Sequence, residues 1–175
     1  MKKNSIALIG FMATGKTTIG KALADKLGND YNFIETDQII IEDAGKSIPE
    51  IFTEDGEIRF REYEIAACKK ASQLKNAVIS CGGGVVLNKI NIDYLKKNSY
   101  IVLLKSTSEE IYERAMKDGK ESRPVINKED PKSEIEKVLI FRRPFYEAAA
   151  EIIIETKGKE IEEKVQEIIS KIELE

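Results

Sequence analysis

The sequence predicts an α/β domain with a central five-stranded parallel sheet covered by helices on both faces. Short apolar runs alternate along the chain with longer stretches of helical period. The first apolar run passes directly into a glycine-rich turn and then a helical pattern, which is the order of a strand–turn–helix unit. The chain has 175 residues, the length of a single domain, so one domain over 1–175 is expected.

Five apolar segments are the predicted strands, at 5–9, 31–35, 77–80, 100–104 and 152–155. Helical periods follow at 17–27 and 161–172, and segment 37–73 has the pattern of several helices. Within it, Ser47 and Glu50 have the spacing of a capping box. Segment 117–130 is polar without a clear period and ends where Pro131 begins another helix. Its length predicts a mobile loop of the kind that forms lids.

Composition excludes several classes of function. The net charge of -3 argues against a dedicated nucleic-acid binder. No apolar stretch approaches the roughly 18 residues of a membrane span. The two cysteines form no disulfide framework, which favours the cytoplasm. There is no histidine, so chemistry must rest on carboxylates, lysine, arginine and backbone amides. No feature predicts a protein partner, and a monomer is expected.

The segment GFMATGKT, from Gly10 to Thr17, fits the phosphate-binding loop G-x-x-x-x-G-K-[ST]. Gly10 and Gly15 allow the backbone to curl so that successive N–H groups point at phosphate oxygens. Lys16 would reach the β- and γ-phosphates, and the Thr17 hydroxyl can hold Mg²⁺. The strand before the motif and the helical pattern after it make a chance glycine turn a poor alternative.

Two carboxylates, Glu35 and Asp37, stand at the end of the second predicted strand. Two positions apart on a strand, they would point to the same face, and strand ends line the ligand crevice of an open α/β sheet. One could serve Mg²⁺ and the other an acceptor hydroxyl, as base or orienter. The alternative is an aspartate that only caps the next helix.

Two arginines fall on apolar helix faces. Arg61 lies on a stripe with Ile58, Ile65 and Cys68. On the helix over 133–150, the predicted apolar face consists of Ile135, Val138, Leu139, Phe145, Tyr146 and Ala149, and it includes Arg142 but not Arg143. A guanidinium there must be paired or lie at a site edge, where its fork suits a carboxylate or phosphate. The alternatives are a structural ion pair or a side chain that snorkels to water.

Three consecutive glycines, Gly82 to Gly84, follow the third predicted strand. Each costs roughly 0.5–1 kcal/mol relative to alanine, so a close approach to the main chain is expected. The alternative is a tight loop that needs positive φ. Arg123, in the predicted lid, could close onto phosphates, although a solvated loop residue is its alternative.

Taken together, the phosphate-binding loop and the segments FIETD, GEIRFRE, SCGGGVV, SRPVI and RRPFYEAAAEIIIET resemble the shikimate kinase family along the whole chain. The resemblance implies a three-layer P-loop kinase fold with a helical substrate-binding insertion at about 37–73 and a lid at about 117–130. It also implies ATP-dependent phosphorylation of the shikimate 3-hydroxyl, in the biosynthesis of chorismate and aromatic amino acids.

The resemblance assigns roles to matching positions. ATP would be bound by Ala13, Thr14, Gly15, Lys16, Thr17 and Thr18, by Arg123 from the lid, and by Lys159 on the adenine side. Mg²⁺ would be held by Thr17 and Glu35. Catalysis would rest on Asp37, Lys16 and Arg123. Shikimate would be met by Asp37, by the main chain of Gly82, Gly83 and Gly84, and by Arg61 and Arg142, which would clasp its carboxylate.

The sequence departs from the family pattern at two positions. Ala13 replaces a usual glycine, which we expect to require a negative φ there, and Glu35 replaces a usual aspartate. The lid's second arginine could be replaced by Arg114 or Lys117. Two other functions stay open at this point: another small-molecule kinase, such as a gluconate or nucleoside monophosphate kinase, and a nucleotide-binding regulatory protein without phosphoryl transfer.

Overall fold

The computed structural model describes residues 3–117 and 129–172. The strands are β1 (Ser5–Ile9), β2 (Asn32–Glu35), β3 (Ala77–Ser80), β4 (Ser99–Lys105) and β5 (Ile152–Glu155). The α-helices are α1 (Lys16–Leu27), α2 (Thr36–Ala44), α3 (Ile48–Glu50), α4 (Gly56–Ala71), α5 (Lys89–Leu95), α6 (Ser108–Lys117), α7 (Pro131–Ala149) and α8 (Ile161–Lys171). A π-helical turn, η1 (Ile51–Asp55), and a 3₁₀ turn, η2 (Val85–Leu87), complete the elements.

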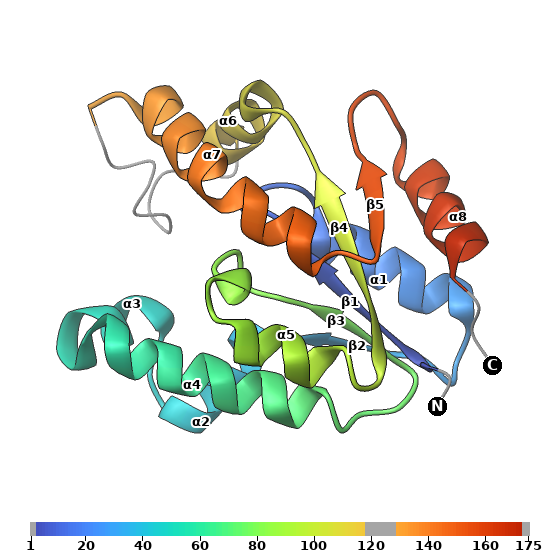
Figure 1. The fold of residues 1–175 in the computed structure, drawn as a ribbon, viewed down its shortest axis with the longest axis horizontal. Helices are drawn as coiled ribbons and strands as arrows, with labels where there is room; N and C mark the ends of the chain where they lie inside the picture. The colour runs from blue at the N-terminus through green and yellow to red at the C-terminus, as the bar shows by residue number, and fades with distance from the viewer. Residues whose placement is uncertain (1–2, 118–128, 173–175) are drawn as a thin grey trace.

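The five strands form one parallel sheet in the order β2-β3-β1-β4-β5, which confirms the predicted α/β fold class. The predicted strands match the observed ones to within one residue at each end. Because β1 lies at the centre, the loop after it and the loop after β3 lie side by side at the carboxyl edge of the sheet (Figure 1). That edge is where ligands bind in open α/β sheets.

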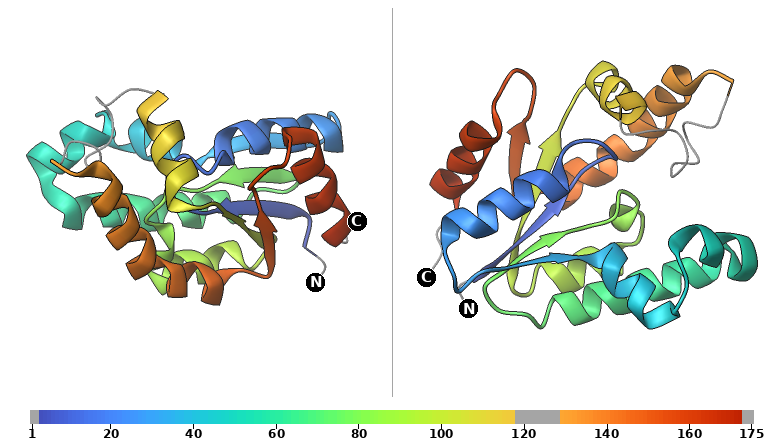
Figure 2. Two further views of the ribbon diagram at one scale, coloured as in Figure 1. Left: turned by 90° about the horizontal axis from the view of Figure 1, so that it is seen from above. Right: turned by 180° about the vertical axis from the view of Figure 1, so that it is seen from behind.

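Helices cover both faces of the sheet. Figure 1 shows α4, α5 and α7 in front of it, and the reverse view in Figure 2 shows α1 and α8 on the other side. Alternate residues of β1 divide between the two cores: Ala7 and Ile9 pack toward α4, α5 and α7, whereas Ile6 and Leu8 pack toward α1 and α8. This alternation is the period of two that a strand imposes.

The segment between β2 and β3 consists of α2, α3, η1 and α4, in agreement with the several helices predicted for 37–73. It has a small core of its own around Ile40, Ile51, Phe60 and Ala67. The predicted capping box is confirmed: Glu50 N–H donates to the Ser47 hydroxyl, and Ser47 N–H donates to the Glu50 carboxylate. Pro131 begins α7 as predicted, with Asp130 as its N-cap. Within the described ranges, no helix is both long and apolar enough to cross a membrane.

Candidate active site

The glycine-rich loop between β1 and α1 has the backbone that the motif predicts. Gly10 has φ +148°, and a Cβ there would lie 2.6 Å from the Leu104 carbonyl oxygen, while Gly15 has φ +92°. Only glycine meets both demands. The Lys16 amine donates to the carbonyl oxygens of Gly10 and Phe11, each at 2.8 Å. The amine therefore lies across its own loop.

Ala13 corrects one expectation, because its φ is +57° and not negative. An L-residue in this left-handed region costs roughly 1–2 kcal/mol. The Arg114 guanidinium donates to the Ala13 carbonyl at 3.3 Å. Of the two predicted candidates for the second lid arginine, Arg114 is thus the one in contact with the loop. Next along the chain, the buried Thr14 hydroxyl donates to the Phe11 carbonyl at 2.8 Å, so its side chain holds the loop and does not face a ligand.

The side chains of Thr17 and Glu35 are joined by a hydrogen bond. The Thr17 hydroxyl donates to Glu35 Oε1 at 2.6 Å, although the residues belong to α1 and β2. A hydroxyl and a carboxylate are hard oxygen donors of the kind that Mg²⁺ prefers. In residues 3–117 and 129–172 no group of three or more acidic, cysteine or histidine side chains could form an all-protein metal site. As hard oxygen donors, Thr17 and Glu35 fit Mg²⁺, which usually keeps waters and phosphate oxygens as its other ligands.

Asp37 lies close to this pair but not on the strand. The strand ends at Glu35, and Asp37 belongs to the first turn of α2, so the argument from alternating strand positions was wrong. The alternative role is also excluded, because the N-cap of α2 is Glu35. Burial raises the pKa of the Asp37 carboxyl, the Lys16 amine opposes this rise, and the Glu35 carboxylate adds to it. A carboxylate of this kind is a stronger proton acceptor than a solvated aspartate.

These groups line a single open cavity of about 380 Å³. Its lining consists of Met12, Ala13, Gly15, Lys16, Thr17, Thr18, Glu35, Asp37, Ser80, Cys81, Gly82 and Gly83. The structure thus brings together most of the residues predicted for nucleotide, metal and acceptor. Both cysteines are free and buried, and burial raises the pKa of Cys81 to about 12, so its thiol is unreactive filler.

The three glycines lie between the functional side chains. None of them has a positive φ, which excludes the tight-loop alternative. A Cβ at Gly82 would lie 2.9 Å from Asp37 Oδ1, and a Cβ at Gly84 would lie 2.6 Å from Arg61 Nη1. A Cβ at Gly83 would meet only ordinary contacts, of which the nearest is the Met12 nitrogen at 3.6 Å. The glycines therefore leave room for Asp37 and Arg61, and Gly83 faces the phosphate-binding loop.

Arg142 approaches the glycine segment from α7. Its guanidinium donates to the Gly83 carbonyl at 3.3 Å and lies 5.8 Å from the Phe11 ring centroid. The Tyr146 hydroxyl donates to the same carbonyl, one helical turn further on. As predicted, Arg142 is half-buried and Arg143 is exposed. Phe145, expected on the apolar face, is 42% exposed, so that part of the pattern was wrong.

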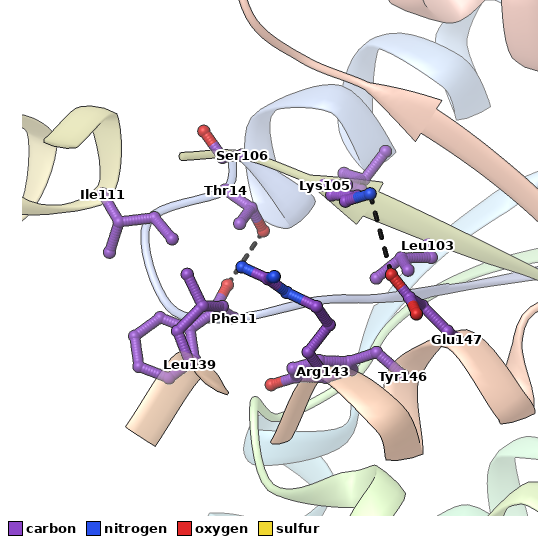
Figure 3. A pocket seen from close by; sticks show the side chains of 11 residues that line it. Phe11, Thr14, Leu103, Lys105, Ser106, Ile111, Leu139, Arg143, Tyr146 and Glu147 are labelled. Carbon is purple, nitrogen blue, oxygen red and sulfur yellow. Dashed lines mark hydrogen bonds and ion pairs between the residues drawn. The ribbon is translucent and has the colours of Figure 1, made fainter. Parts of the chain in front are cut away.

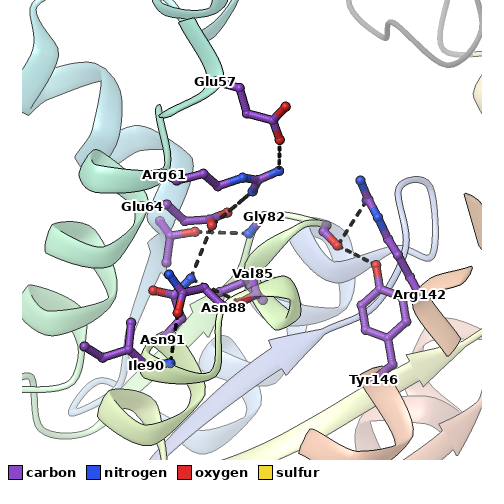
Figure 4. Close-up of polar contacts among 12 residues, drawn as sticks. Glu57, Arg61, Glu64, Gly82, Val85, Asn88, Ile90, Asn91, Arg142 and Tyr146 are labelled. Atoms are coloured by element: carbon purple, nitrogen blue, oxygen red, sulfur yellow. Dashed lines mark hydrogen bonds and ion pairs between the residues drawn. The ribbon is translucent and has the colours of Figure 1, made fainter. Parts of the chain in front are cut away.

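Arg61 approaches from α4 on the opposite side of the same segment, as Figure 4 shows. Its Nη1 lies 3.1 Å from Glu64 Oε2, and its Nη2 lies 3.1 Å from Glu57 Oε1. The predicted stripe was partly wrong, because Ile58 is 82% exposed. Arg61 thus forms the structural ion pair that was the alternative to a binding role. It also lies beside the site, against Gly84.

A second, smaller cavity of about 30 Å³ lies behind the phosphate-binding loop. Phe11 and Thr14 line it from the loop, and Arg143 lines it from α7 (Figure 3). Its volume suits about one water molecule and is far too small for a nucleotide. Arg143 therefore faces a packing gap and not the candidate site.

Five of the predicted residues that the structure describes do not line the larger cavity: Thr14, Arg61, Gly84, Arg142 and Lys159. The Lys159 amine lies 2.5 Å from Glu167 Oε2 on α8, and Lys159 does not line the pocket. Arg123 and nearly all of the predicted lid, 117–130, lie outside the described residues.

Several polar residues in or beside the site were not predicted, among them Glu64, Tyr146 and Thr36. Glu64 is 2% exposed between Arg61 and Asn91, and burial raises the pKa of its carboxyl. Tyr146 was expected only as an apolar residue. The buried Thr36 hydroxyl accepts from Gly82 N–H at 3.1 Å. Only Glu64 left a signal in the sequence, namely an acid three residues after an arginine in helical context.

Comparisons with known proteins agree on one family. A family model described as "Shikimate kinase" matches residues 12–173. The shikimate kinase of Caldanaerobacter subterraneus subsp. tengcongensis is 47% identical over 165 residues, which are 94% of each chain. The shikimate kinase of Thermodesulfovibrio yellowstonii is 40% identical over 169 residues, covering 97% of this chain and 95% of that one.

Solved structures agree as well. The shikimate kinase from Acinetobacter baumannii in complex with shikimate has a TM-score of 0.88 at 31% identity, covering 96% of this chain and 92% of that one. A gluconokinase from Sinorhizobium meliloti 1021 has a TM-score of 0.57 at 15% identity, covering 97% of this chain and 92% of that one, which shows a shared fold only. The extent of these matches, with the loop, glycine segment and arginines in place, establishes that the chain belongs to the shikimate kinase family.

Proposed function

We propose that this protein transfers the γ-phosphoryl group of ATP to the 3-hydroxyl of shikimate, giving shikimate 3-phosphate and ADP. The observation that carries the proposal is the single cavity in which Lys16 and Asp37 face the glycine segment, with Arg61 and Arg142 on either side of that segment. Family membership supports the same reaction. In that reaction shikimate is phosphorylated as a step of chorismate and aromatic amino acid biosynthesis.

Asp37 is the base or orienter for the acceptor hydroxyl. Its raised pKa favours acceptance of a proton as the hydroxyl attacks, and the Lys16 amine opposes that rise in pKa by stabilising the ionised form. When phosphate enters, Lys16 can exchange its two carbonyl partners, Gly10 and Phe11, for phosphate oxygens. Mg²⁺ held by Thr17 and Glu35 would neutralise charge on the phosphate oxygens.

The backbone of residues 13–18 binds ATP phosphates, with Arg123 closing over them and Lys159 on the adenine side. Gly82, Gly83 and Gly84 meet shikimate through their main chain, and Arg61 with Arg142 clasps its carboxylate. Charge supports this clasp, because the Arg142 guanidinium donates to a neutral carbonyl, that of Gly83, and an anion would be a stronger acceptor. We further expect a cytoplasmic monomer that binds no nucleic acid.

The test is ADP release with Mg-ATP and each of four acceptors: shikimate, quinate, gluconate and AMP. Turnover with shikimate alone is expected. Turnover with gluconate or AMP instead would keep the phosphate site and contradict the assignment of Arg61, Arg142 and the glycines. ATP binding without turnover of any acceptor would favour a regulatory nucleotide-binding protein.

A further inference from the structure

Asn91 is fully buried on α5, beneath the glycine segment. Its amide nitrogen donates to Glu64 Oε2 at 3.2 Å and to the Val85 carbonyl oxygen at 3.1 Å. Its own oxygen, Oδ1, is buried with no hydrogen-bond partner among the residues that the structure describes. Figure 4 shows Asn91 between Glu64 and Val85.

The two partners fix the orientation of this amide. Both are acceptors, a carboxylate oxygen and a carbonyl oxygen, so the NH₂ group must face them. The consequence is an oxygen left without a partner, which destabilises the folded chain. The amide therefore leaves one buried oxygen unpaired while it donates to two acceptors, the Glu64 carboxylate and the Val85 carbonyl.

The two bonds of Asn91 reach both sides of one contact in the site. On one side, Glu64 binds Arg61, whose Nη1 lies 3.1 Å from the same Oε2 that Asn91 binds. On the other side, Val85 directly follows Gly84, where a Cβ would lie 2.6 Å from that guanidinium. Asn91 thus joins the partner of Arg61 to the end of the glycine segment.

We infer that Asn91 is a positioning residue that holds the Arg61 guanidinium in register with the glycine segment for the carboxylate of the acceptor. The inference rests on the proposed function, because it assigns Asn91 to the acceptor half of the site. Asn91 itself does not line the cavity. It acts through Glu64.

A purely structural role, as a cap of α5, is already filled by another residue. Asn88 is the N-cap of that helix, and its side chain accepts from Ile90 N–H at 3.2 Å. Asn88→Ala therefore weakens the same helix without touching Glu64 or Val85. It is the matched control for Asn91→Leu, which keeps the number and branching of the side-chain heavy atoms and removes both donors.

The experiment measures kcat and both KM values for the wild type, Asn91→Leu and Asn88→Ala, with thermal unfolding of each. Loss of a hydrogen bond to a charged group predicts that Asn91→Leu raises the KM for shikimate about tenfold. Its kcat and its KM for ATP should stay within about twofold of the wild type, because the side-chain hydrogen bonds of Asn91 go to Glu64 and Val85 and not to the phosphate-binding loop or Asp37. Asn88→Ala should leave all three values unchanged. If Asn91→Leu does not fold, Asn91→Ala serves for the same measurement.

A double-mutant cycle with Glu64→Gln distinguishes positioning of Arg61 through Glu64 from a general structural role of Asn91. If Asn91 acts through Glu64, Asn91→Leu should add less than about twofold to the KM for shikimate on the Glu64→Gln background. Additive effects, or an unchanged KM in Asn91→Leu alone, would overturn the inference while the wild type still phosphorylates shikimate. If the wild type does not phosphorylate shikimate, the proposed function fails and this inference fails with it.

Discussion

Gly84 lies directly against the guanidinium of Arg61, so that a Cβ at Gly84 would come within 2.6 Å of Arg61 Nη1. Gly84→Ala should displace the end of that flexible side chain and not the backbone. We expect the KM for shikimate to rise about tenfold with little change in melting temperature, because the loss is that of one charge-assisted contact. Steady-state kinetics with thermal unfolding checks this. An unchanged KM would show that the position of Arg61 does not matter for the acceptor.

Gly83→Ala tests whether the glycine at this position is required for substrate binding or for stability of the fold. A Cβ here would be 3.6 Å from its nearest neighbour, an ordinary contact, so the free energy of unfolding should change by less than about 0.5 kcal/mol. If the acceptor packs on this main chain, kcat/KM for shikimate should nevertheless fall about tenfold or more. Loss of stability with normal kinetics would mean that the glycine serves packing.

Asp37→Asn should lower kcat by about 10²-fold or more, because a neutral amide cannot accept the proton of the attacking hydroxyl. The KM values should change much less. Single-turnover transfer from ATP to shikimate measures the chemical step itself. A variant that keeps near-normal kcat would exclude Asp37 as base or orienter.

The same substitution should raise the melting temperature near pH 7. Burial raises the pKa of Asp37 in the folded chain, so as pH rises the unfolded state loses its proton first. The free energy of unfolding of the wild type therefore falls as the pH rises from the unfolded pKa to the raised folded pKa, and stays lower above it. Asparagine does not ionise, so the variant keeps that stability. The gain should vanish as the pH falls below about 4, where the wild type is protonated in both the folded and the unfolded state. An equal gain at both pH values would contradict burial as the cause.

Arg142→Ala should raise the KM for shikimate by about 10- to 100-fold, the range expected for a lost hydrogen bond to a charged group. Arg143→Ala is the matched control, since Arg143 is the next residue of α7 but faces the small cavity behind the loop. It should leave the KM for shikimate unchanged. Equal effects of the two substitutions would mean that the positive charge on α7 in general, and not direct contact with Arg142, lowers the KM for shikimate.

The positive φ of Ala13 predicts a stabilising glycine. Ala13→Gly removes a strain of roughly 1–2 kcal/mol against an entropic cost of roughly 0.5–1 kcal/mol, so the free energy of unfolding should rise by about 0.5–1 kcal/mol. Ala22→Gly, inside α1, should lower it by about 1 kcal/mol. Urea unfolding of both variants measures these changes. Destabilisation by Ala13→Gly would contradict the strained conformation.

The fold was largely predictable from the sequence because parallel strands buried on both faces are short apolar runs, and all five were found. The phosphate-binding loop was equally visible, since its glycines answer backbone demands that no other residue meets. The predicted apolar helix faces contained errors where the helical period was extended to residues beyond the core. Ile58 and Phe145 fit an apolar stripe but lie exposed, because the sequence does not say where a helix runs past the core.

The acceptor half of the site was less predictable. Arg61 and Arg142 could be proposed from their helix faces, but of their partners only Glu64 left a signal in the sequence, as an acid three residues after Arg61. Glu64 and Asn91 come from α4 and α5, and only the tertiary packing of these helices brings them together. Likewise the positive φ of Ala13 goes against the ordinary preference of alanine, so the residue type alone does not predict it.

The central claim is that two arginines on opposite sides of the glycine segment recognise the carboxylate of the acceptor. Its most direct test compares kcat/KM for shikimate with that for shikimate methyl ester, in the wild type and in Arg142→Ala. The wild type should prefer shikimate about 10²-fold, and Arg142→Ala should lose most of that preference. A wild type that phosphorylates the ester as well as the acid would contradict the claim.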